Sequence, residues 1–411
     1  MSDHRTFVIV GAGQAGRWLA LTLRSSGFGG RIVWFGDEAH RPYERPPLSK
    51  GVLKGPVELA QIGLLADDKW AELDIDWRAG QRVVAIDRAA RQVRTDQGDE
   101  VGYDTLFLAH GGRARTLPGV PAHDRVLTLR TWDDALQIRA QLHAAARVLV
   151  LGGGWIGLEV AASARLLGRE VTVIEAAPRL CMRTMPPCVS AHLRALHESQ
   201  GVDLRLGVAV TGVQADDSGV TVTLADGQTV AGDVLVVGIG LKANDELAAE
   251  AGLTVANGVL VDANGRSEDP AIFAVGDVAN ALQADGSRLR IESWENAQRQ
   301  AVAAARAALD LAHDPAAEGP PWFWSDQFDD NLQVLGQPDE RLTMVERVDP
   351  ARRQRIFFFC DGPRVRAMAA VNAGREIKLV RKWMLQQRFP DLARLNDTTV
   401  DLQKLPVQAV A

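Results

Sequence analysis

A repeated glycine pattern constrains the fold of this chain more than any other feature. The segments FVIVGAGQAGRWLALTLRSSG, from Phe7, and VLVLGGGWIGLEVAASARLLG, from Val148, align without gaps at a constant offset of 141 residues. Each is predicted to form a buried strand, a GxGxxG turn and a helix, followed by a second strand, RIVWFG or EVTVIE. The glycines are Gly11, Gly13 and Gly16 in the first copy and Gly152, Gly154 and Gly157 in the second. The chain is therefore predicted to contain two βαβ units of one design.

Turns of this kind bind dinucleotides. Their glycines let the backbone approach a pyrophosphate, whose negative charge then lies at a helix N-terminus. An acid beyond the second strand can accept hydrogen bonds from a ribose. Glu175 holds that position in the second copy, whereas in the first copy the strand ends at Gly36 and Asp37 and Glu38 follow. One GxGxxG also occurs without a ligand, but two in register indicate two dinucleotides, most economically a resident flavin and an exchanging nicotinamide.

Length and charge narrow the class of protein. A chain of 411 residues exceeds one ordinary core, so two or three domains are expected. The net charge of −6 argues against a nucleic-acid partner, and no apolar run or signal peptide points to a membrane, so a cytoplasmic location is expected. Three irregularly spaced cysteines, Cys181, Cys188 and Cys360, are expected to be reduced thiols rather than disulfides or metal ligands.

A third motif follows much later in the chain. PAIFAVGDVAN, from Pro270, is a short apolar strand that ends in Gly-Asp. It resembles the motif with which flavoprotein reductases hold the ribityl chain of FAD, so Asp277 is expected to accept hydrogen bonds from ribityl hydroxyls. The alternative is an ordinary strand followed by a Gly-Asp turn.

Together these segments resemble the two-dinucleotide-binding flavoprotein reductases of the glutathione reductase superfamily. Within it, the resemblance is to the FAD-dependent NADH:ferredoxin reductases, which include putidaredoxin reductase and the reductase components of aromatic-ring dioxygenases. The resemblance is carried by GDEAHRPYERPPLSK (36–50), GGGWIGLEVAA (152–162), FAVGDVAN (273–280), IESWENAQRQ (291–300) and PWFWSDQF (321–328). It implies an α/β chain with two Rossmann-like domains and a smaller α+β C-terminal domain. The FAD domain would comprise residues 1–112 and 243–318, the NAD domain 113–242 and the C-terminal domain 319–411.

The same resemblance implies the FAD-binding residues. Gly11, Gly13 and Gly16 would hold the pyrophosphate, Asp37 or its neighbour Glu38 the adenosine ribose, and Asp277 the ribityl chain. Trp294 would open a helix whose N-terminus faces the flavin ring, where it stabilises negative charge. Lys50 would lie beside the flavin N5 edge, and the remaining residues that line FAD would be Val83 and Arg130.

For NADH, the resemblance implies contacts by Gly152, Gly154, Ile156, Gly157, Glu159 and Glu175. A carboxylate at position 175 accepts ribose hydroxyls but repels a 2′-phosphate, which favours NADH over NADPH. Arg179 and Arg183 leave NADPH open as an alternative, although both can equally be surface arginines.

Glu159 is the unusual residue of the second motif, because it brings a carboxylate into an otherwise apolar helix start, WIGLEVAASA. It could merely complement the helix dipole. The resemblance instead implies that it meets Lys50 beside the nicotinamide and the flavin, and that both residues are catalytic.

One departure from the resembled family, and the absence of an early cysteine, bear on the chemistry. His110 stands where the resembled reductases have the threonine of Ala-Thr-Gly, and a packing variation is expected there. No cysteine precedes Cys181, whereas disulfide reductases carry a redox cysteine soon after the first unit, so thiol relay chemistry is not expected. A flavin can accept electrons in pairs and release them singly, so a 2Fe–2S ferredoxin, including the Rieske type, is the expected acceptor.

The predicted function is therefore electron transfer from NADH through FAD to a ferredoxin that feeds an aromatic-ring-hydroxylating dioxygenase. The ferredoxin would dock near Trp322 and Trp324 and a basic surface around Lys378, Arg381, Lys382 and Arg388. Domain packing is the alternative role for the two tryptophans, and an ordinary solvated face that for the basic residues. Alternative functions are a reductase for a cytochrome P450 ferredoxin or a rubredoxin, a direct NADH oxidase, and a flavoprotein resembling apoptosis-inducing factor.

Overall fold

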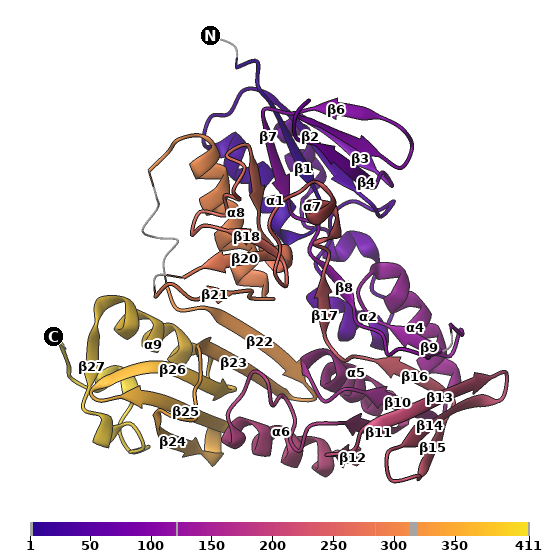
Figure 1. Cartoon of the computed structure of the whole chain (residues 1–411). Coiled ribbons are helices and arrows are strands. Elements are labelled where there is room, and N and C mark those ends of the chain that lie inside the picture. The colour runs from indigo at the N-terminus through magenta and orange to yellow at the C-terminus, as the bar shows by residue number, and fades with distance from the viewer. Residues whose placement is uncertain (1–2, 121, 284, 313–318, 410–411) are drawn as a thin grey trace. The chain divides into compact units, whose positions relative to one another are not determined.

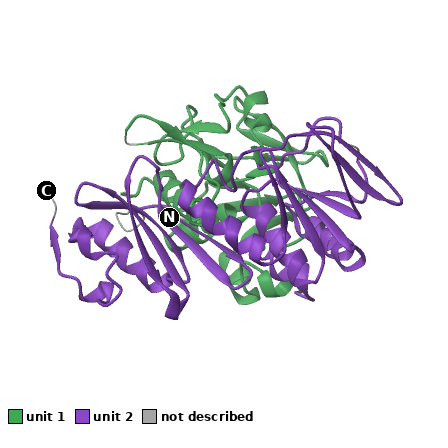
Figure 2. Ribbon diagram, turned by 90° about the horizontal axis from the view of Figure 1, so that it is seen from below, with its two compact units in different colours: residues 1–44, 58–113, 241–318 green, residues 45–57, 114–240, 319–411 purple. Residues whose placement is uncertain are grey.

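The computed structural model describes residues 3–120, 122–283, 285–312 and 319–409. The chain is a mixed α/β protein with two parallel sheets and a separate antiparallel sheet near the C-terminus, which confirms the predicted fold class (Figure 1). It divides into two compact units: unit 1 contains residues 1–44, 58–113 and 241–318, and unit 2 contains residues 45–57, 114–240 and 319–411 (Figure 2). None of the helices in the described residues is long and apolar enough to cross a membrane.

Unit 1 is built on a five-stranded sheet of order β19-β7-β1-β2-β3. All of its neighbouring strands are parallel. The strands are β1 (Thr6–Val10), β2 (Arg31–Gly36), β3 (Ile75–Ala79), β7 (Thr105–Leu108) and β19 (Ile272–Ala274). Phe7 and Ile9 of the central strand pack into the same cluster as α1 (Gln14–Ser25) and α8 (Trp294–Ala308), whereas Val8 and Val10 pack on the opposite face. A central strand buried on both faces explains its unbroken apolar sequence.

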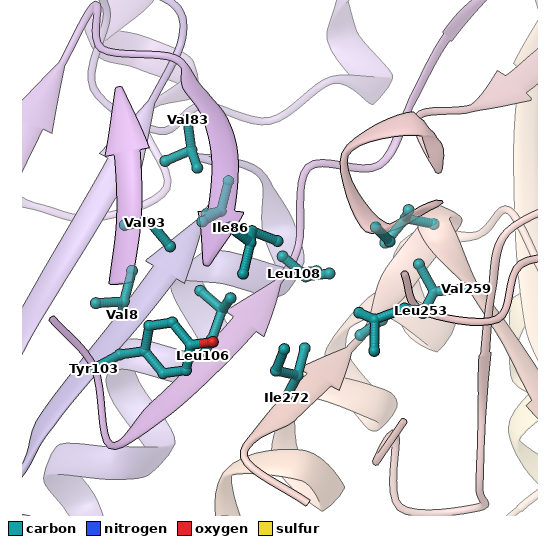
Figure 3. Packing of buried hydrophobic residues seen from close by; sticks show 14 of the residues in the cluster. Val8, Val83, Ile86, Val93, Tyr103, Leu106, Leu108, Leu253, Val259 and Ile272 are labelled. Atoms are coloured by element: carbon teal, nitrogen blue, oxygen red, sulfur yellow. The ribbon is translucent and has the colours of Figure 1, made fainter. Parts of the chain in front are cut away.

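The second face of this sheet carries a separate apolar cluster (Figure 3). Val8, Leu106 and Leu108 of the sheet share this cluster with residues of an antiparallel sheet and of later strands. Burial also raises the pKa of Tyr103, a member of the cluster, to about 12. The smaller elements of unit 1 are α3 (Asp67–Leu73), β4 (Val83–Asp87), β5 (Gln92–Thr95), β6 (Glu100–Gly102), α7 (Glu246–Glu250), β18 (Val259–Val261), β20 (Ala279–Leu282) and β21 (Arg288–Leu289). Paired strands β8 (Gly112–Ala114) and β17 (Leu241–Ala243) lie at its limits.

Unit 2 contains the second parallel sheet, of order β12-β11-β10-β16-β9. Its strands are β9 (Val126–Thr128), β10 (Arg147–Leu151), β11 (Glu170–Glu175), β12 (Asp203–Leu206) and β16 (Val234–Val237), and its helices are α4 (Trp132–Ala144), α5 (Trp155–Leu166) and α6 (Pro187–Ser199). The strand β10 and the helix α5 begin and end 141 residues after β1 and α1, so the predicted repeat is confirmed. An antiparallel sheet is added by β13 (Val210–Asp216), β14 (Gly219–Leu224) and β15 (Thr229–Gly232).

The C-terminal part of unit 2 is an antiparallel sheet of order β22-β23-β26-β25-β24. Its elements are β22 (Trp322–Gln327), β23 (Asp330–Gly336), β24 (Thr343–Asp349), β25 (Gln354–Asp361), β26 (Arg364–Val371) and α9 (Gly374–Gln386), followed by the pair β27 (Arg388–Pro390) and β28 (Val407–Ala409). One face packs on α9 through Ile377, Val380 and Trp383, and the other packs on Leu158 of α5 and Leu193 of α6. The sheet is therefore covered on both faces.

The segment PPLSK belongs to unit 2, although the prediction placed it in the FAD domain. It forms a 3₁₀ turn at Pro46–Ser49 and then the short helix α2 (Gly51–Lys54), which contacts α4 and α5. The predicted limits of the three domains remain a prediction, but this contact brings the segment of Lys50 onto the helix of Glu159.

Candidate functional site

The first glycine turn, between β1 and α1, assigns a different task to each glycine. Gly11 has φ +113°, and a Cβ there would lie 2.4 Å from the carbonyl oxygen of Ala109. A Cβ at Gly16 would lie 2.2 Å from the carbonyl oxygen of Gly11. Gly13 precedes α1 without a side-chain cap, and a Cβ there would meet nothing within 4 Å. Two glycines are thus required by close packing, and the third leaves open space at uncapped helix amides.

The second turn, between β10 and α5, repeats this arrangement. A Cβ at Gly152 would lie 2.4 Å from the carbonyl oxygen of Gly238, and one at Gly157 would lie 2.0 Å from that of Gly152. Gly154 is again open and precedes a helix without a side-chain cap. Open space at unsatisfied N–H groups of a helix N-terminus suits a pyrophosphate. Both turns therefore fit the group predicted for them.

The strand-end acids differ between the two copies for a steric reason. Glu175 ends β11, and its carboxylate accepts hydrogen bonds from the backbone N–H groups of Gly153, at 2.6 Å, and Ala177, at 2.7 Å. In the first copy a Cβ at Gly36 would lie 2.5 Å from the indole of Trp77. A side chain is therefore excluded at the strand end, and the acids of the first copy follow it as Asp37 and Glu38.

The two acids of the first copy have different partners. Asp37 is exposed and lies 3.8 Å from the guanidinium of Arg82. Glu38 accepts a hydrogen bond from the hydroxyl of Tyr43 at 2.5 Å. A ribose contact by Asp37 thus remains the prediction, with Glu38 as its alternative.

Asp277 lies close to the first glycine turn. Its neighbour Gly276 has φ +74°, and a Cβ there would lie 3.3 Å from the Cβ of Ala15, in the first turn of α1. The backbone N–H of Gly276 donates to Gln300 of α8 at 2.8 Å, which fixes this turn between the two helices. Trp294 is the first residue of α8, as predicted from the sequence. Unit 1 thus brings Asp277 next to the start of α1.

The other predicted lining residues are in three environments. Val83 is buried in the cluster of Figure 3. Arg130 belongs to unit 2, where its carbonyl oxygen accepts a hydrogen bond from Arg45 at 2.5 Å and its N–H donates to Asp134 at 2.9 Å. Ile156 lies in the first turn of α5 with 45% of its surface exposed. An exposed apolar side chain beside the open glycine is suited to contact a bound nucleotide.

The predicted ion pair between Lys50 and Glu159 is present. The two groups lie 2.9 Å apart, and their side chains are 17% and 3% exposed. The Glu159 carboxylate also accepts hydrogen bonds from the hydroxyls of Ser49 and of Ser325, the latter at 2.6 Å. A buried carboxylate requires such partners, because its desolvation is otherwise too costly. Three donors from two segments exceed what a residue that only complements a helix dipole would need.

Ser49 and Ser325 were missed as site residues by the sequence reasoning. Both lie in segments that carry the family resemblance, PPLSK and WSDQ, and this position was the sequence signal that could have identified them. The hydroxyl of Ser163, one turn further along α5, donates to the carbonyl oxygen of Ser49 at 2.8 Å. It therefore fastens the PPLSK segment to α5 beside the ion pair.

His110 and the three cysteines are not members of the Lys50–Glu159 ion pair. The His110 ring nitrogen Nε2 lies 2.7 Å from the carbonyl oxygen of Asn244, and burial lowers the pKa of the imidazole. The three cysteines carry free thiols. Burial raises the pKa of Cys181 and Cys188 and raises that of Cys360 to about 11, so their reactive thiolate forms are disfavoured.

Two glycine turns with open helix starts, each followed by an acid, define a protein with two dinucleotide-binding sites. Comparison with known proteins agrees. Residues 5–301 match the model of the pyridine nucleotide-disulphide oxidoreductase family, and residues 322–406 match that of the reductase C-terminal domain. The chain belongs to the pyridine nucleotide-disulphide oxidoreductase family, and it is an oxidoreductase.

Relatives and solved structures narrow the class. The chain is 44% identical to the ferredoxin–NAD(+) reductase component of an anthranilate 1,2-dioxygenase system from Burkholderia cepacia, covering 97% of this chain and 98% of that one. It is 39% identical to the corresponding component of a 3-phenylpropionate/cinnamic acid dioxygenase from Photorhabdus laumondii, covering 92% and 96%.

Two solved structures have the same fold over nearly the whole chain. The covalent putidaredoxin reductase–putidaredoxin complex gives a TM-score of 0.90 at 36% identity and covers 97% of both chains. The ferredoxin reductase of the CYP199A2 system from Rhodopseudomonas palustris gives 0.91 at 35% identity and covers 98% and 99%. These similarities agree with the resemblance inferred from the sequence.

Proposed function

We propose that this chain is an NADH-dependent, FAD-containing reductase that passes electrons singly to a 2Fe–2S ferredoxin of an aromatic-ring-hydroxylating dioxygenase. FAD, when bound, supplies the conversion of a two-electron donor into single electrons. The observation that carries the proposal is the buried Lys50–Glu159 ion pair, because it lies on the helix that begins at the second glycine turn. The names of the two relatives, both ferredoxin–NAD(+) reductase components, support the acceptor.

The roles of the protein residues follow from their positions. The turn of Gly11, Gly13 and Gly16 would bind the FAD pyrophosphate at the start of α1, with Asp37 on the ribose and Asp277 on the ribityl hydroxyls. The turn of Gly152, Gly154 and Gly157 would bind NADH. Lys50 and Glu159 would orient the reacting nicotinamide, since a buried ion pair holds both side chains in a fixed geometry.

NADH is the favoured nucleotide because of Glu175 and its surroundings. A carboxylate held over the glycine turn repels a 2′-phosphate. Arg179, which could accommodate that phosphate, donates hydrogen bonds to the carbonyl oxygen of Met185 and to the hydroxyl of Ser190. This engagement supports a structural role for Arg179. Arg183, which is exposed, is then the one of the two arginines that could still accommodate a 2′-phosphate.

For the ferredoxin we propose a docking surface that includes Trp324 and the exposed basic residues of α9. Trp322 and Trp324 stack with ring centroids 5.0 Å apart. Trp322 packs against the cluster under α9 and donates to Gln333 at 3.0 Å, so domain packing accounts for part of its role. The Rieske or ordinary type of the ferredoxin, and a cytoplasmic location, belong to the same proposal.

A reconstituted electron-transfer assay tests the proposal. NADH-dependent reduction of cytochrome c should be rapid only when a 2Fe–2S ferredoxin is added. Slow flavin turnover with a persistent NADH charge-transfer complex would instead favour a protein resembling apoptosis-inducing factor. Stoichiometric oxygen consumption without a carrier would favour an NADH oxidase. Exchange of the ferredoxin for a P450-type ferredoxin or a rubredoxin distinguishes the remaining alternatives.

A further inference from the structure

A chain of buried polar side chains leads from Glu159 to a histidine that the proposed reaction does not use. Ser325 Oγ lies 2.6 Å from Glu159 Oε1, and Gln327 Nε2 lies 3.0 Å from Ser325 Oγ. Gln327 Oε1 lies 2.8 Å from His197 Nε2. These three residues are each at most 2% exposed, and all belong to unit 2. A continuous set of hydrogen bonds among buried side chains is held in one geometry, because each broken link leaves an unpaired polar group.

The ion pair fixes the direction of every hydrogen bond in this chain. Because Glu159 is paired with Lys50, its carboxylate can only accept, so the Ser325 hydroxyl donates to it. The Ser325 oxygen is then free to accept from the Gln327 amide nitrogen, which turns the Gln327 oxygen toward His197. His197 must therefore carry a proton on Nε2. All three donors point toward Glu159.

The state of His197 follows from its surroundings. It is fully buried on α6, its ring packs edge-on against Phe328, and its Nδ1 has no hydrogen-bond partner among the described residues. Burial lowers the pKa of the imidazole. A neutral ring with its proton on Nε2 supplies the donor that Gln327 Oε1 requires and leaves only the Nδ1 lone pair without a partner among the described residues. The other tautomer would leave both Gln327 Oε1 and the Nδ1–H without partners.

We propose that Ser325, Gln327 and His197 are positioning residues that keep the Glu159 carboxylate directed at Lys50. This inference rests on the proposed reductase function. Without the hydroxyl of Ser325, one oxygen of Glu159 would depend on Lys50 alone. Without the Nε2 proton of His197, the Gln327 amide can rotate and accept the Ser325 proton, which removes that proton from Glu159. The C-terminal sheet thereby sets the geometry of a group on the nucleotide-binding helix.

Strand β22 allows this arrangement because its successive side chains point to opposite faces of the sheet. Ser325 and Gln327 lie on the face toward α5 and α6, where Phe323 contacts Trp155 with ring centroids 4.9 Å apart. His197 reaches the same face from α6. A contact of a different kind joins the same helix and sheet, the 3.1 Å pair of His192 and Asp330, which does not lead to Glu159. It provides a matched control.

Stopped-flow reduction of the FAD-loaded protein by NADH tests the inference. Ser325→Ala should lower the limiting rate constant about 10-fold, as expected for one hydrogen bond to a charged group, with little change in the apparent Kd for NADH. Ser325→Thr should restore the rate. His197→Leu should lower it about 3-fold, because the amide is released rather than removed, and His197→Gln, whose amide can donate to Gln327, should restore it.

A control variant and a measurement that does not depend on activity complete the test of the positioning role. His192→Gln should react like the wild type, and flavin absorbance and thermal unfolding report whether each variant is folded. Equal rates for His197→Leu and His197→Gln, or for Ser325→Ala and Ser325→Thr, would overturn the positioning role. Nitrogen NMR of histidine-labelled protein, assigned with His197→Gln, should show a neutral ring protonated at Nε2; an Nδ1 proton would refute the chain even if the Ser325 variants fail to fold. A wild-type protein that NADH does not reduce would instead refute the proposed function.

Discussion

The backbone N–H of Gly153 donates to the carboxylate of Glu175 at 2.6 Å, so the acid at the end of β11 lies directly over the second glycine turn. This contact orients the carboxylate without a cation. Its negative charge can therefore repel a second anion, and its remaining lone pairs can accept hydrogen bonds from hydroxyl groups.

Glu175→Ala should therefore raise the KM for NADH about 10-fold, through loss of hydrogen bonds to a charged group, and should narrow the preference for NADH over NADPH. Steady-state kinetics with both nucleotides measure this. Glu170→Ala, at the exposed start of the same strand, serves as the control. An unchanged ratio of kcat/KM values for the two nucleotides would contradict the assigned role of Glu175.

Lys50→Met and Glu159→Gln should each slow flavin reduction by NADH, by about 10-fold to 100-fold, because each leaves the other member of a buried pair without its counter-charge. FAD should stay bound, as measured by flavin absorbance after gel filtration. The double variant should lose less than the product of the two single effects, since the partners act together. Wild-type stopped-flow rates in both single variants would exclude the pair from the reaction.

Reversal of charge on α9 should slow association with an acidic ferredoxin. Lys378 and Lys382 are exposed, whereas Arg381 donates to the carbonyl oxygen of Pro320, so the two lysines are the better targets. Lys378→Glu with Lys382→Glu should lower the rate of ferredoxin reduction about 10-fold at low salt, and the difference should shrink as salt screens the charges. The pair Lys69→Glu with Arg94→Glu makes the same charge change in unit 1. Equal effects of both double variants would indicate a response to net charge alone.

The buried His197 should make the folded state sensitive to mild acid. Its pKa is lowered by burial from an ordinary value of about 6.5, so below that value the unfolded chain binds a proton that the folded chain does not. Its contribution to stability is therefore complete above the unfolded pKa and falls as the pH drops toward the folded one. His197→Gln should reduce the pH dependence of the free energy of unfolding by up to about 1.4 kcal/mol per pH unit in that window. Denaturant unfolding at several pH values, with His143→Gln as an exposed control, measures this.

The two strand–turn–helix units could be predicted from the sequence because one repeats the other. The glycine turns fix strand, turn and helix within one stretch of chain, and the bounds of α1 and α5 follow the predicted offset. The ion pair of Lys50 and Glu159 was also predicted, from the family resemblance of PPLSK and of the second turn.

The surroundings of that pair depend on tertiary register and could not be predicted in this way. The donation by Ser325 requires the inward face of β22 to meet α5, and His197 lies on an unremarkable helix whose sequence shows no motif. Likewise, no sequence pattern assigns residues 45–57 to unit 2, because that assignment results from contacts with α4 and α5.

The alternation of β22 has a consequence for protein engineering. Its odd positions, 323, 325 and 327, contact α5 and α6, and its even positions 322 and 324 carry the stacked indoles. A single-residue insertion in this strand would exchange the two faces. Chimeric reductases that exchange C-terminal domains therefore have to retain the odd positions of the recipient.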